Sequence, residues 1–326
     1  MNSLLLSRNL ALEAVRVTEI AAIASSFHMG RGNEKAADQS AVNAMRDYLN
    51  DLDINGKVVI GEGERDKAPM LYIGETVGKG GINVDIALDP LEGTTITAHG
   101  GENALSVLAI GEEGSFLHAP DIYMKKIAYG YKYQDLNIDI NDEPKKIIDD
   151  FSKYSGIRQE NIVVCILDRL RHKNLISEVR ATGARIKLIP DGDVSAVIAT
   201  SIDDSGIDIY MGTGGSPEGV LAAAALRCLG GKIYSKLIYD TDESFERANK
   251  MGILDKDKIY ETLDLAKGDV MFSATGVTDG TLLKGVRIKD NFAYTQSVVM
   301  RSQTSTVRHI TVKHNLNIKK YKSYFN

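Results

Sequence analysis

Short apolar runs and amphipathic segments alternate along the chain. Between residues 9 and 24, the apolar positions Leu10, Ala14, Val17 and Ala21 recur at steps of four and three, which predicts a helix with one buried face. Further runs are short and aliphatic, as is typical of strands; they cover residues 57–60, 84–88, 104–110, 127–131, 162–167, 184–189, 207–211, 270–274, 294–300 and 307–312. Helical segments lie between several of these runs, so the pattern predicts an α/β fold.

Acidic residues follow one of these strand-like runs directly. The stretch from Asp89 to Thr94 reads Asp-Pro-Leu-Glu-Gly-Thr, and we expect Pro90 and Gly93 to turn the backbone out of the strand. Asp89, Glu92 and Thr94 can then converge at the carboxyl end of that strand. Oxygen ligands of this kind suit Mg²⁺ or Mn²⁺, although Asp-Pro and Glu-Gly pairs also form turns that bind nothing.

Two further acidic positions could join this turn. Glu62 follows the strand-like run at residues 57–60, and acidic turns at two strand ends of an open α/β sheet can face one crevice. Asp38 opens an amphipathic segment that extends to Leu49, where it is either a helix cap or a third ligand.

In the second half of the chain, acidic residues again follow a strand-like run. Asp191-Gly192-Asp193 follows a strand-like run and precedes a helix-like one. Taken alone, this pattern fits a helix cap, the metal-diphosphate clamp of a glycosyltransferase or a haloacid-dehalogenase nucleophile.

A glycine-rich stretch at residues 212–219 leads into a helix-like run. Glycines before a helix allow backbone N–H groups to approach a phosphate. The stretch is not a dinucleotide fingerprint, because Pro217 stands where the third glycine is expected. Glu218 at the helix start is either a carboxylate favoured by the helix dipole or a metal ligand. Arg169 and Arg171 follow another strand-like run, where they could grip a phosphate or lie solvated on the surface.

Composition excludes several classes of protein. The 326 residues are 43% hydrophobic and 25% charged, which is typical of a globular protein. A formal charge of -5 argues against a nucleic-acid binder. No apolar stretch approaches the roughly 18 to 20 residues of a membrane span, and the first residues are too short for a signal sequence, so we expect a cytoplasmic protein without a membrane partner. The six histidines show no zinc spacing.

A polar segment at residues 134–155 suggests a boundary between two domains. We expect a metal-binding α/β unit at residues 1–140 and a sugar-phosphate-binding α/β unit at residues 141–326.

Together these clusters resemble the class II fructose-1,6-bisphosphatase family, from about residue 9 to residue 314. The resemblance is greatest to the branch whose members also cleave sedoheptulose 1,7-bisphosphate. It is carried by blocks at residues 30–32 (Gly-Arg-Gly), 36–38 (Ala-Ala-Asp), 58–75, 89–94, 119–124 (Ala-Pro-Asp-Ile-Tyr-Met), 171–172 (Arg-His), 190–193 (Pro-Asp-Gly-Asp) and 216–219 (Ser-Pro-Glu-Gly).

The resemblance implies a layered α/β/α/β/α fold, similar to that of the lithium-sensitive sugar and inositol phosphatases. It also implies metal-dependent hydrolysis of the 1-phosphate of fructose 1,6-bisphosphate by direct attack of water, which yields fructose 6-phosphate and phosphate. Sedoheptulose 1,7-bisphosphate is the expected second substrate. The expected setting is gluconeogenesis or the Calvin cycle, and the expected assembly is a homodimer or homotetramer.

The same resemblance assigns the site residues, with the active site between the two units. It implies one site for Mn²⁺ or Mg²⁺ from Asp38 and Glu62, and another from Asp89, Glu92 and Glu218. The resemblance assigns catalytic roles to Thr94, Glu62 and Asp66. Thr94 would orient the attacking water, assisted by the carboxylate of either Glu62 or Asp66. Substrate contacts fall on Glu92, Gly93, Thr94, Tyr123, Arg169, Leu170, Arg171, Asp191, Gly192, Asp193 and Gly215.

The chain departs from the family pattern in a few places. Many relatives carry Asp at the position of Asn33 followed directly by Lys, whereas here Glu34 intervenes and Lys35 stands one place later. A phosphate contact from Lys35 is therefore an open question. Leu91 replaces a Cys of some bifunctional relatives, which removes a redox switch at that place.

Three other functions remain possible at this point. One is an inositol-phosphate or nucleotide 3'-phosphatase of the same superfamily. Another is a glycosyltransferase built on residues 191–193, which would leave the acidic turns at Glu62 and Asp89 unexplained. The third is a non-catalytic sugar-phosphate sensor, which Asn33 and Glu34 suggest.

Overall fold

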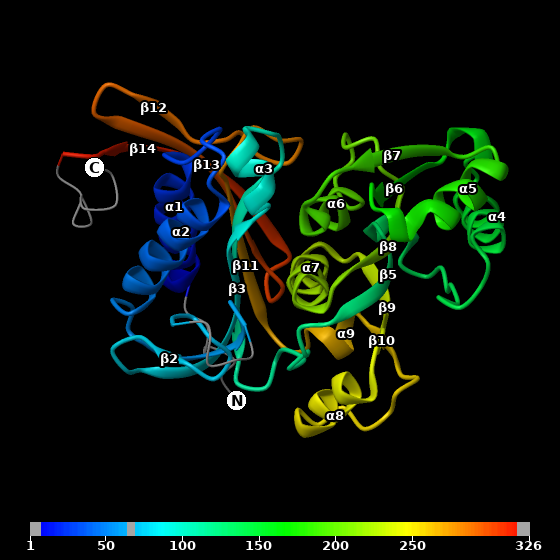
Figure 1. Cartoon of the computed structure of the whole chain (residues 1–326), viewed down its shortest axis with the longest axis horizontal. Coiled ribbons are helices and arrows are strands. Elements are labelled where there is room, and N and C mark those ends of the chain that lie inside the picture. The colour runs from blue at the N-terminus through cyan, green and yellow to red at the C-terminus, as the bar shows by residue number, and fades with distance from the viewer. Residues whose placement is uncertain (1–7, 64–68, 318–326) are drawn as a thin grey trace. The chain divides into compact units, whose positions relative to one another are not determined.

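The chain folds into two compact units. The computed structural model describes residues 8–63 and 69–317 (Figure 1). Met1–Leu117 and Lys267–Asn326 form the first unit, and His118–Ala266 form the second. The division differs from the expected boundary near residue 140, because the chain returns after the second unit to complete the sheet of the first.

The first unit is built on an eight-stranded sheet. Its strand order is β12-β13-β11-β4-β3-β1-β2, and β14 pairs with β13. The elements are α1 (Arg8–Ser26), α2 (Glu34–Leu49), β1 (Ile54–Ile60), β2 (Thr76–Val77), β3 (Ile82–Glu92), α3 (Thr94–His99), β4 (Leu105–Glu112), β11 (Val270–Gly276), β12 (Arg287–Lys289), β13 (Phe292–Arg301) and β14 (Thr306–Asn315). The pairing of β11 with β4 joins the two halves of the unit in one sheet.

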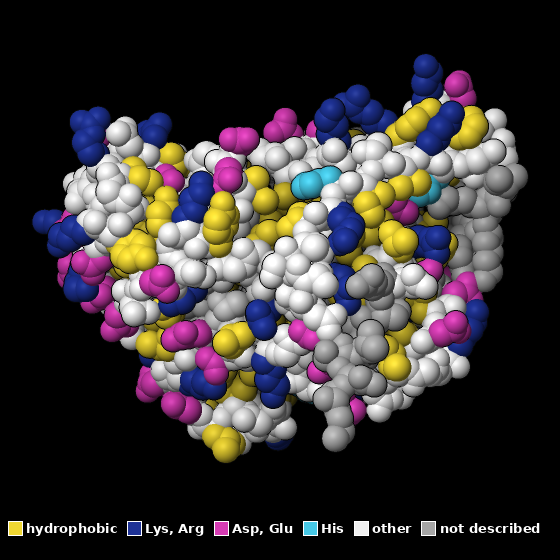
Figure 2. Space-filling view, turned by 180° about the vertical axis from the view of Figure 1, so that it is seen from behind, with side chains coloured by type: hydrophobic (Ala, Val, Ile, Leu, Met, Phe, Trp, Pro, Cys, Tyr) yellow, Lys and Arg dark blue, Asp and Glu magenta, His cyan; other side chains and the backbone are white. Residues whose placement is uncertain are grey.

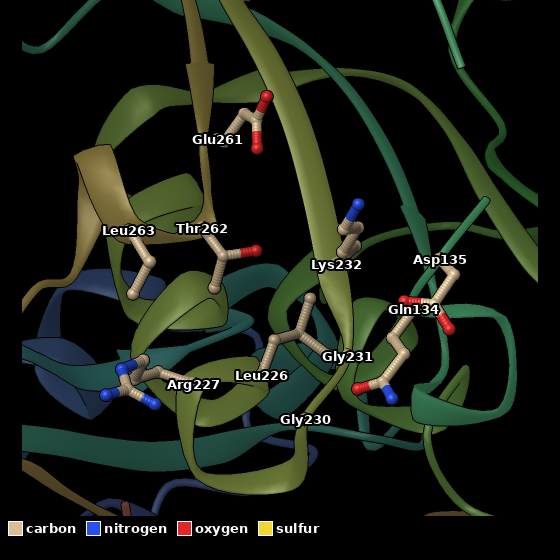
Figure 3. A pocket seen from close by; sticks show the side chains of 10 residues that line it. All are labelled: Gln134, Asp135, Leu226, Arg227, Gly230, Gly231, Lys232, Glu261, Thr262 and Leu263. Carbon is tan, nitrogen blue, oxygen red and sulfur yellow. The ribbon is translucent and has the colours of Figure 1, made fainter. Parts of the chain in front are cut away.

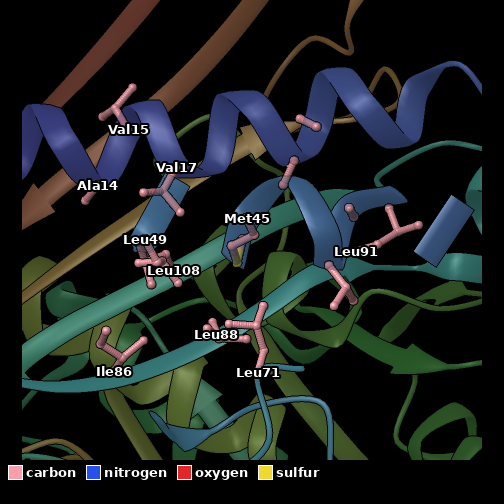
Figure 4. Close-up of a cluster of buried hydrophobic side chains, with 14 of the residues drawn as sticks. Ala14, Val15, Val17, Met45, Leu49, Leu71, Ile86, Leu88, Leu91 and Leu108 are labelled. Atoms are coloured by element: carbon pink, nitrogen blue, oxygen red, sulfur yellow. The ribbon is translucent and has the colours of Figure 1, made fainter. Parts of the chain in front are cut away.

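The two long helices of this unit pack on its sheet. The apolar residues of α1 that the four-and-three spacing predicts are buried, among them Ala14 and Val17. Figure 4 shows these side chains beside Met45 and Leu49 of α2 and above sheet residues such as Ile86. This core fixes α2 against β3, and both elements carry predicted metal ligands.

The second unit is built on a six-stranded sheet of order β10-β9-β5-β8-β6-β7. Its elements are β5 (Tyr123–Tyr129), η1 (Tyr131–Tyr133), α4 (Pro144–Ser155), η2 (Gln159–Asn161), β6 (Val163–Leu167), η3 (Leu170–His172), α5 (Lys173–Ala181), β7 (Arg185–Ile189), α6 (Asp193–Ala199), β8 (Ile209–Gly215), α7 (Ser216–Leu229), β9 (Lys232–Leu237), α8 (Asp242–Lys250), β10 (Ile259–Glu261) and α9 (Thr262–Leu265). Helices α4 and α5 lie on one side of this sheet, and α6 and α7 lie on the other (Figure 1).

The predicted fold class is confirmed, since both units combine a sheet with helices. The first helix and each predicted strand are present, with ends that differ by a few residues. Two local expectations are corrected. Asp38 lies inside α2 rather than at its start, because Asn33 caps the helix. Strand β3 also continues through Pro90 to Glu92, so the bend expected after Asp89 is an irregular strand end, where the pairing with β4 shifts register between Asp89 and Glu92.

The described part of the chain contains no helix that is both long and apolar enough to cross a bilayer. Basic and acidic side chains both occur across the face of the molecule in Figure 2. That face therefore lacks the uniform positive charge that attracts nucleic acid.

Substituting Gly61 by Ala should destabilise the turn that presents Glu62. A Cβ at Gly61 would lie 2.2 Å from the carbonyl oxygen of Leu71, which accepts a hydrogen bond from the Glu62 N–H at 3.0 Å. We expect Gly61→Ala to lower the free energy of unfolding by about 1–3 kcal/mol, measured by urea denaturation. The control is Gly101→Ala, whose Cβ would come no closer than 3.3 Å to its nearest neighbour, the Cγ2 methyl group of Ile96. Equal stability of the two variants would contradict the role of this contact.

Candidate active site

The end of β3 and the start of α3 carry the acidic turn of the first unit. Asp89 and Glu92 each offer a carboxylate oxygen, and these two oxygens lie within 4.8 Å of each other. The backbone N–H of Leu91 donates to Oδ1 of Asp89 at 2.9 Å, which fixes that carboxylate beside the strand end. Gly93 precedes α3 with a φ of 96°, in the left-handed region that favours glycine. The carboxylates of Asp89 and Glu92 thus lie close together, and Thr94 is the first residue of α3.

Glu62 lies near this turn because β1 runs parallel to β3. Adjacent parallel strands end at the same edge of a sheet, and Glu62 follows β1 as Asp89 ends the regular part of β3. Burial raises the pKa of Glu62 well above its usual range, and the charges of Asp89 and Asp38 add to the increase. Burial also raises the pKa of Asp38, on the second turn of α2. Side chains from α2, β1 and β3 thus form one electrostatic cluster.

This cluster fits a hard divalent cation. Its donors are carboxylate oxygens, the ligand type that Mg²⁺ and Mn²⁺ take. Burial, and to a smaller extent the charges of Asp89 and Asp38, disfavours the ionised form of Glu62 and raises its pKa. A bound cation would remove that penalty.

The unusual Asn33-Glu34-Lys35 segment has a structural role at the start of α2. The side-chain oxygen of Asn33 accepts a hydrogen bond from the Ala36 N–H at 3.1 Å and caps the helix. Glu34 and Lys35 are exposed in the first turn. The predicted catalytic residue Asp66 lies outside the described residues.

In the second unit, Arg171 and His172 form hydrogen bonds with the backbone near the end of β8. The Nε of Arg171 donates to the carbonyl oxygen of Thr213 at 2.9 Å, and the N–H of Thr213 donates to Nε2 of His172 at 2.8 Å. Nδ1 of His172 then donates to the carbonyl oxygen of Leu167 at 2.8 Å, so the ring is a neutral tautomer. Burial, and to a smaller extent Arg171, lowers the pKa of His172 and favours this state.

These hydrogen bonds hold Arg171 beside Tyr123. The guanidinium carbon of Arg171 lies 4.7 Å from the centre of the Tyr123 ring, in cation–π contact. Both side chains remain exposed to solvent. The structure therefore brings together two of the predicted substrate contacts, which are 48 positions apart in the sequence.

Arg169 and Leu170 lie at a cavity on the same unit. Arg169 approaches Asp191 at 3.5 Å, and Leu170 is 95% exposed. The cavity has a volume of about 470 Å³, and Lys173 and Arg180 also line it. Burial raises the pKa of Asp191, an effect that the charge of Arg169 opposes. Positive side chains thus dominate this cavity.

Asp193 has a different environment from Asp191. It is buried at the start of α6, and its Oδ2 accepts hydrogen bonds from Lys126 at 2.6 Å and from the hydroxyl of Tyr210 at 3.2 Å. Lys126 was not singled out from the sequence, because a lysine next to an apolar run is typical of a strand end. A buried salt bridge between a strand and the start of a distant helix leaves no signal in a single sequence.

In the glycine-rich stretch, Gly215 lies against the carboxylate of Glu218. Gly215 ends β8, and Glu218 lies in the first turn of α7. A Cβ at Gly215 would lie 1.9 Å from Oε2 of Glu218, so only glycine permits this approach. A second cavity of about 260 Å³ lies beside Arg227, near the other end of α7 (Figure 3). None of the predicted site residues lines it.

A family model for bacterial fructose-1,6-bisphosphatase, glpX-encoded, matches residues 8–314 of this sequence. The chain belongs to this family. The match includes both the acidic cluster of the first unit and the basic and glycine-rich segments of the second. Family membership confirms the expected resemblance and the expected class of enzyme, a phosphatase.

Cyanobacterial relatives named D-fructose 1,6-bisphosphatase class 2/sedoheptulose 1,7-bisphosphatase are similar over nearly the whole chain. The protein of Trichodesmium erythraeum is 44% identical over 331 residues, which cover 94% of this chain and 96% of the relative. The protein of Microcystis aeruginosa is 44% identical over 338 residues, with 96% and 98% covered. The protein of Synechococcus sp. (strain JA-3-3Ab) is 42% identical over 335 residues, with 95% and 96% covered.

Replacing Glu62 by Gln should stabilise the metal-free protein. Because the pKa of Glu62 is raised, the wild type should lose stability as the pH rises through that pKa, and Glu62→Gln should not. We expect the variant to gain about 1 kcal/mol, which shifts the unfolding midpoint by about 2–4 °C. Differential scanning calorimetry with a chelator present measures the midpoint.

Addition of Mn²⁺ should reverse this order, by raising the midpoint of the wild type more than that of Glu62→Gln. Glu102→Gln is the control, since Glu102 is an exposed glutamate of the same unit. If the Glu62→Gln variant were less stable than the wild type without metal, the destabilising effect of the ionised Glu62 carboxylate would be contradicted.

Proposed function

We propose that this protein hydrolyses the 1-phosphate of fructose 1,6-bisphosphate in a reaction that requires Mn²⁺ or Mg²⁺, and that it also accepts sedoheptulose 1,7-bisphosphate. The products are fructose 6-phosphate or sedoheptulose 7-phosphate, together with phosphate. The observation that carries the proposal is the carboxylate cluster of Asp38, Glu62 and Asp89, in which burial and the neighbouring like charges raise the pKa of Glu62. The family and the names of the relatives supply the substrate class.

Two metal positions account for the carboxylates. Asp38 and Glu62 would form one, and Asp89 and Glu92 would form the other together with Glu218 from the second unit. A divalent cation supplies positive charge that offsets the negative charge developing on the transferred phosphoryl group.

The side chains of the chain would orient the reactants around this charge. The hydroxyl of Thr94, at the start of α3, would hold the attacking water, and Glu62 or Asp66 would accept its proton. The N–H of Thr94 and the backbone of Gly93 would contact the reacting phosphate. Positioning of this kind provides a large share of the rate gain in phosphoryl transfer.

The second unit would hold the rest of the substrate. Arg171, fixed by its hydrogen bond to Thr213, and Arg169 would bind the distal phosphate. Tyr123 would line the same pocket beside Arg171. Asp191 would accept hydrogen bonds from sugar hydroxyls. The assembly into a homodimer or homotetramer, the cytoplasmic location and the placement in gluconeogenesis or the Calvin cycle stay predictions.

Phosphate release from sugar bisphosphates tests the proposal directly. The purified chain should release phosphate from fructose 1,6-bisphosphate and sedoheptulose 1,7-bisphosphate with Mn²⁺ or Mg²⁺, and release should stop when a chelator is added. Glu62→Gln should lower kcat by a factor of about 100 or more, with an unchanged circular dichroism spectrum. Faster release from inositol monophosphate or a nucleoside 3'-phosphate would favour the other phosphatases, and binding without release would favour a sensor.

Replacing Arg171 by Ala should weaken substrate binding more than turnover. Loss of a hydrogen bond to a charged group costs about 1.5–3 kcal/mol, which corresponds to about a 10- to 100-fold increase in KM. Steady-state kinetics measure KM and kcat separately. Arg158→Ala is the control, because Arg158 is an exposed arginine of the same unit that pairs with Glu160 at 2.9 Å. An unchanged KM in Arg171→Ala would rule out the contact with the distal phosphate.

A further inference from the structure

Lys126 is a charged residue in the interior of the second unit. It lies on β5 and is 1% exposed. Its neighbour Ile127 packs in the core that contains residues of α4 and α5. Because side chains alternate along a strand, Lys126 points to the opposite face, toward α6 and α7. A buried lysine is costly unless its charge is paired.

The ammonium group of Lys126 joins two segments that are far apart in the sequence. Nζ donates to Oδ2 of Asp193 at 2.6 Å and to the carbonyl oxygen of Gly215 at 2.8 Å. Asp193 is the first residue of α6 and follows directly on Asp191 and Gly192. Gly215 is the last residue of β8 and leads into the first turn of α7, which carries Glu218. One cation therefore fixes the starts of two helices.

The glycine-rich stretch is shaped around this ion pair. A Cβ at Gly214 would lie 2.1 Å from Oδ2 of Asp193 and 3.0 Å from Nζ of Lys126. A Cβ at Gly219 would lie 3.6 Å from Cδ of Lys126 and 2.5 Å from the sulfur of Met124. Gly214 is therefore required by the approach of Asp193 and Lys126, whereas Gly219 is required by the sulfur of Met124 and leaves ordinary contact with the Lys126 side chain.

Asp193 accepts a further hydrogen bond from Tyr210. The hydroxyl of Tyr210, a fully buried residue of β8, donates to the same Oδ2 at 3.2 Å. An oxygen that accepts from both Lys126 and Tyr210 has little capacity left for a sugar hydroxyl. Asp191 is the more exposed of the two aspartates, so it is better placed to meet a ligand.

We propose that Lys126 is a positioning residue for the phosphatase site, which sets the Asp191–Asp193 segment through Asp193 and the Gly215–Glu218 turn through the Gly215 carbonyl. This inference rests on the proposed function, because it takes Glu218 as a metal ligand and Asp191 as a substrate contact. Groups that orient ligands in this way act without touching the reacting atoms. Both effects should therefore appear in binding as well as in rate.

The experiment compares Lys126→Met with Lys125→Met in the full chain. Lys125 is the adjacent lysine of β5, and its Nζ donates to the carbonyl oxygen of Ile140 at 2.6 Å, away from both segments. We expect Lys126→Met to weaken Mn²⁺ binding, measured by isothermal titration calorimetry, and to raise KM for fructose 1,6-bisphosphate, each by about 10- to 100-fold. Lys125→Met should leave both quantities within about twofold of the wild type, even if it unfolds at a lower temperature.

Lys126→Met leaves Asp193 as an unpaired buried charge, which could prevent folding. A second pair of variants tests the inference in that case. Asp193→Asn and the double variant Lys126→Met/Asp193→Asn both remove that charge. The link to Gly215 predicts that the double variant binds Mn²⁺ at least about tenfold more weakly than Asp193→Asn alone. Lys126→Arg, which keeps the charge, should restore part of the affinity.

The outcomes separate this inference from the proposed function. If the wild type binds Mn²⁺ and releases phosphate but Lys126→Met matches Lys125→Met in KM and Mn²⁺ affinity, Lys126 has only a structural role and the inference fails. Equal Mn²⁺ affinity of Asp193→Asn and the double variant would also overturn it. If the wild type releases no phosphate, the proposed function fails, and the Mn²⁺ titrations of the variants still decide the role of Lys126.

Discussion

The burial of neighbouring carboxylates at Asp38, Glu62 and Asp89 is the constraint on which the candidate site of the first unit depends. Burial, followed by the charges of Asp89 and Asp38, raises the pKa of Glu62, so the folded chain holds these groups together at a cost. Asp38 is carried by a helix capped by Asn33, Asp89 lies on β3, and Glu62 directly follows β1, the parallel neighbour of β3. The packed core of α1, α2 and the sheet fixes these elements, so the carboxylates cannot move apart. Rigid presentation of this kind is what a site for a hard cation requires.

The second unit uses a different arrangement, in which the buried charges of Lys126 and Asp193 pair with each other. Two clamps meet at the end of β8: Arg171 and His172 hold the backbone of Thr213, and Lys126 holds the carbonyl of Gly215. The strand end between them can change little without breaking charged or buried hydrogen bonds. The starts of α6 and α7 are fixed by the same contacts, which leaves Arg169 and Arg171 as exposed positive groups. Such a surface suits a substrate that brings its own negative charge.

Local patterns in the sequence predict most strands and the acidic and basic segments, because each depends on a few neighbouring residues. The apolar runs before Glu62 and Asp89 are buried strands, as predicted. The position of Asp38 within its helix could not be predicted, since the cap at Asn33 competes with it as a start signal. The boundary near residue 140 assumed one continuous segment per unit, whereas β11 returns to pair with β4 over a separation that no local pattern reports. Lys126 was missed for the same reason, because its partners lie 67 and 89 positions away.

The departures at Asn33 and Glu34 suggested a protein that binds a sugar phosphate without cleaving it. The capping bond from Asn33 to Ala36 gives this segment a role in starting α2, and exposed Lys35 is not needed for it. A sensor needs groups that recognise phosphate and sugar, which Arg171, Tyr123 and Asp191 can supply. It does not need three neighbouring carboxylates, of which Glu62 is disfavoured in its ionised state by burial and by the charges of the other two. Clustered negative charge would also weaken the binding of an anionic ligand unless a cation were bound, so the cluster favours an enzyme that uses the cation in catalysis over a simple receptor.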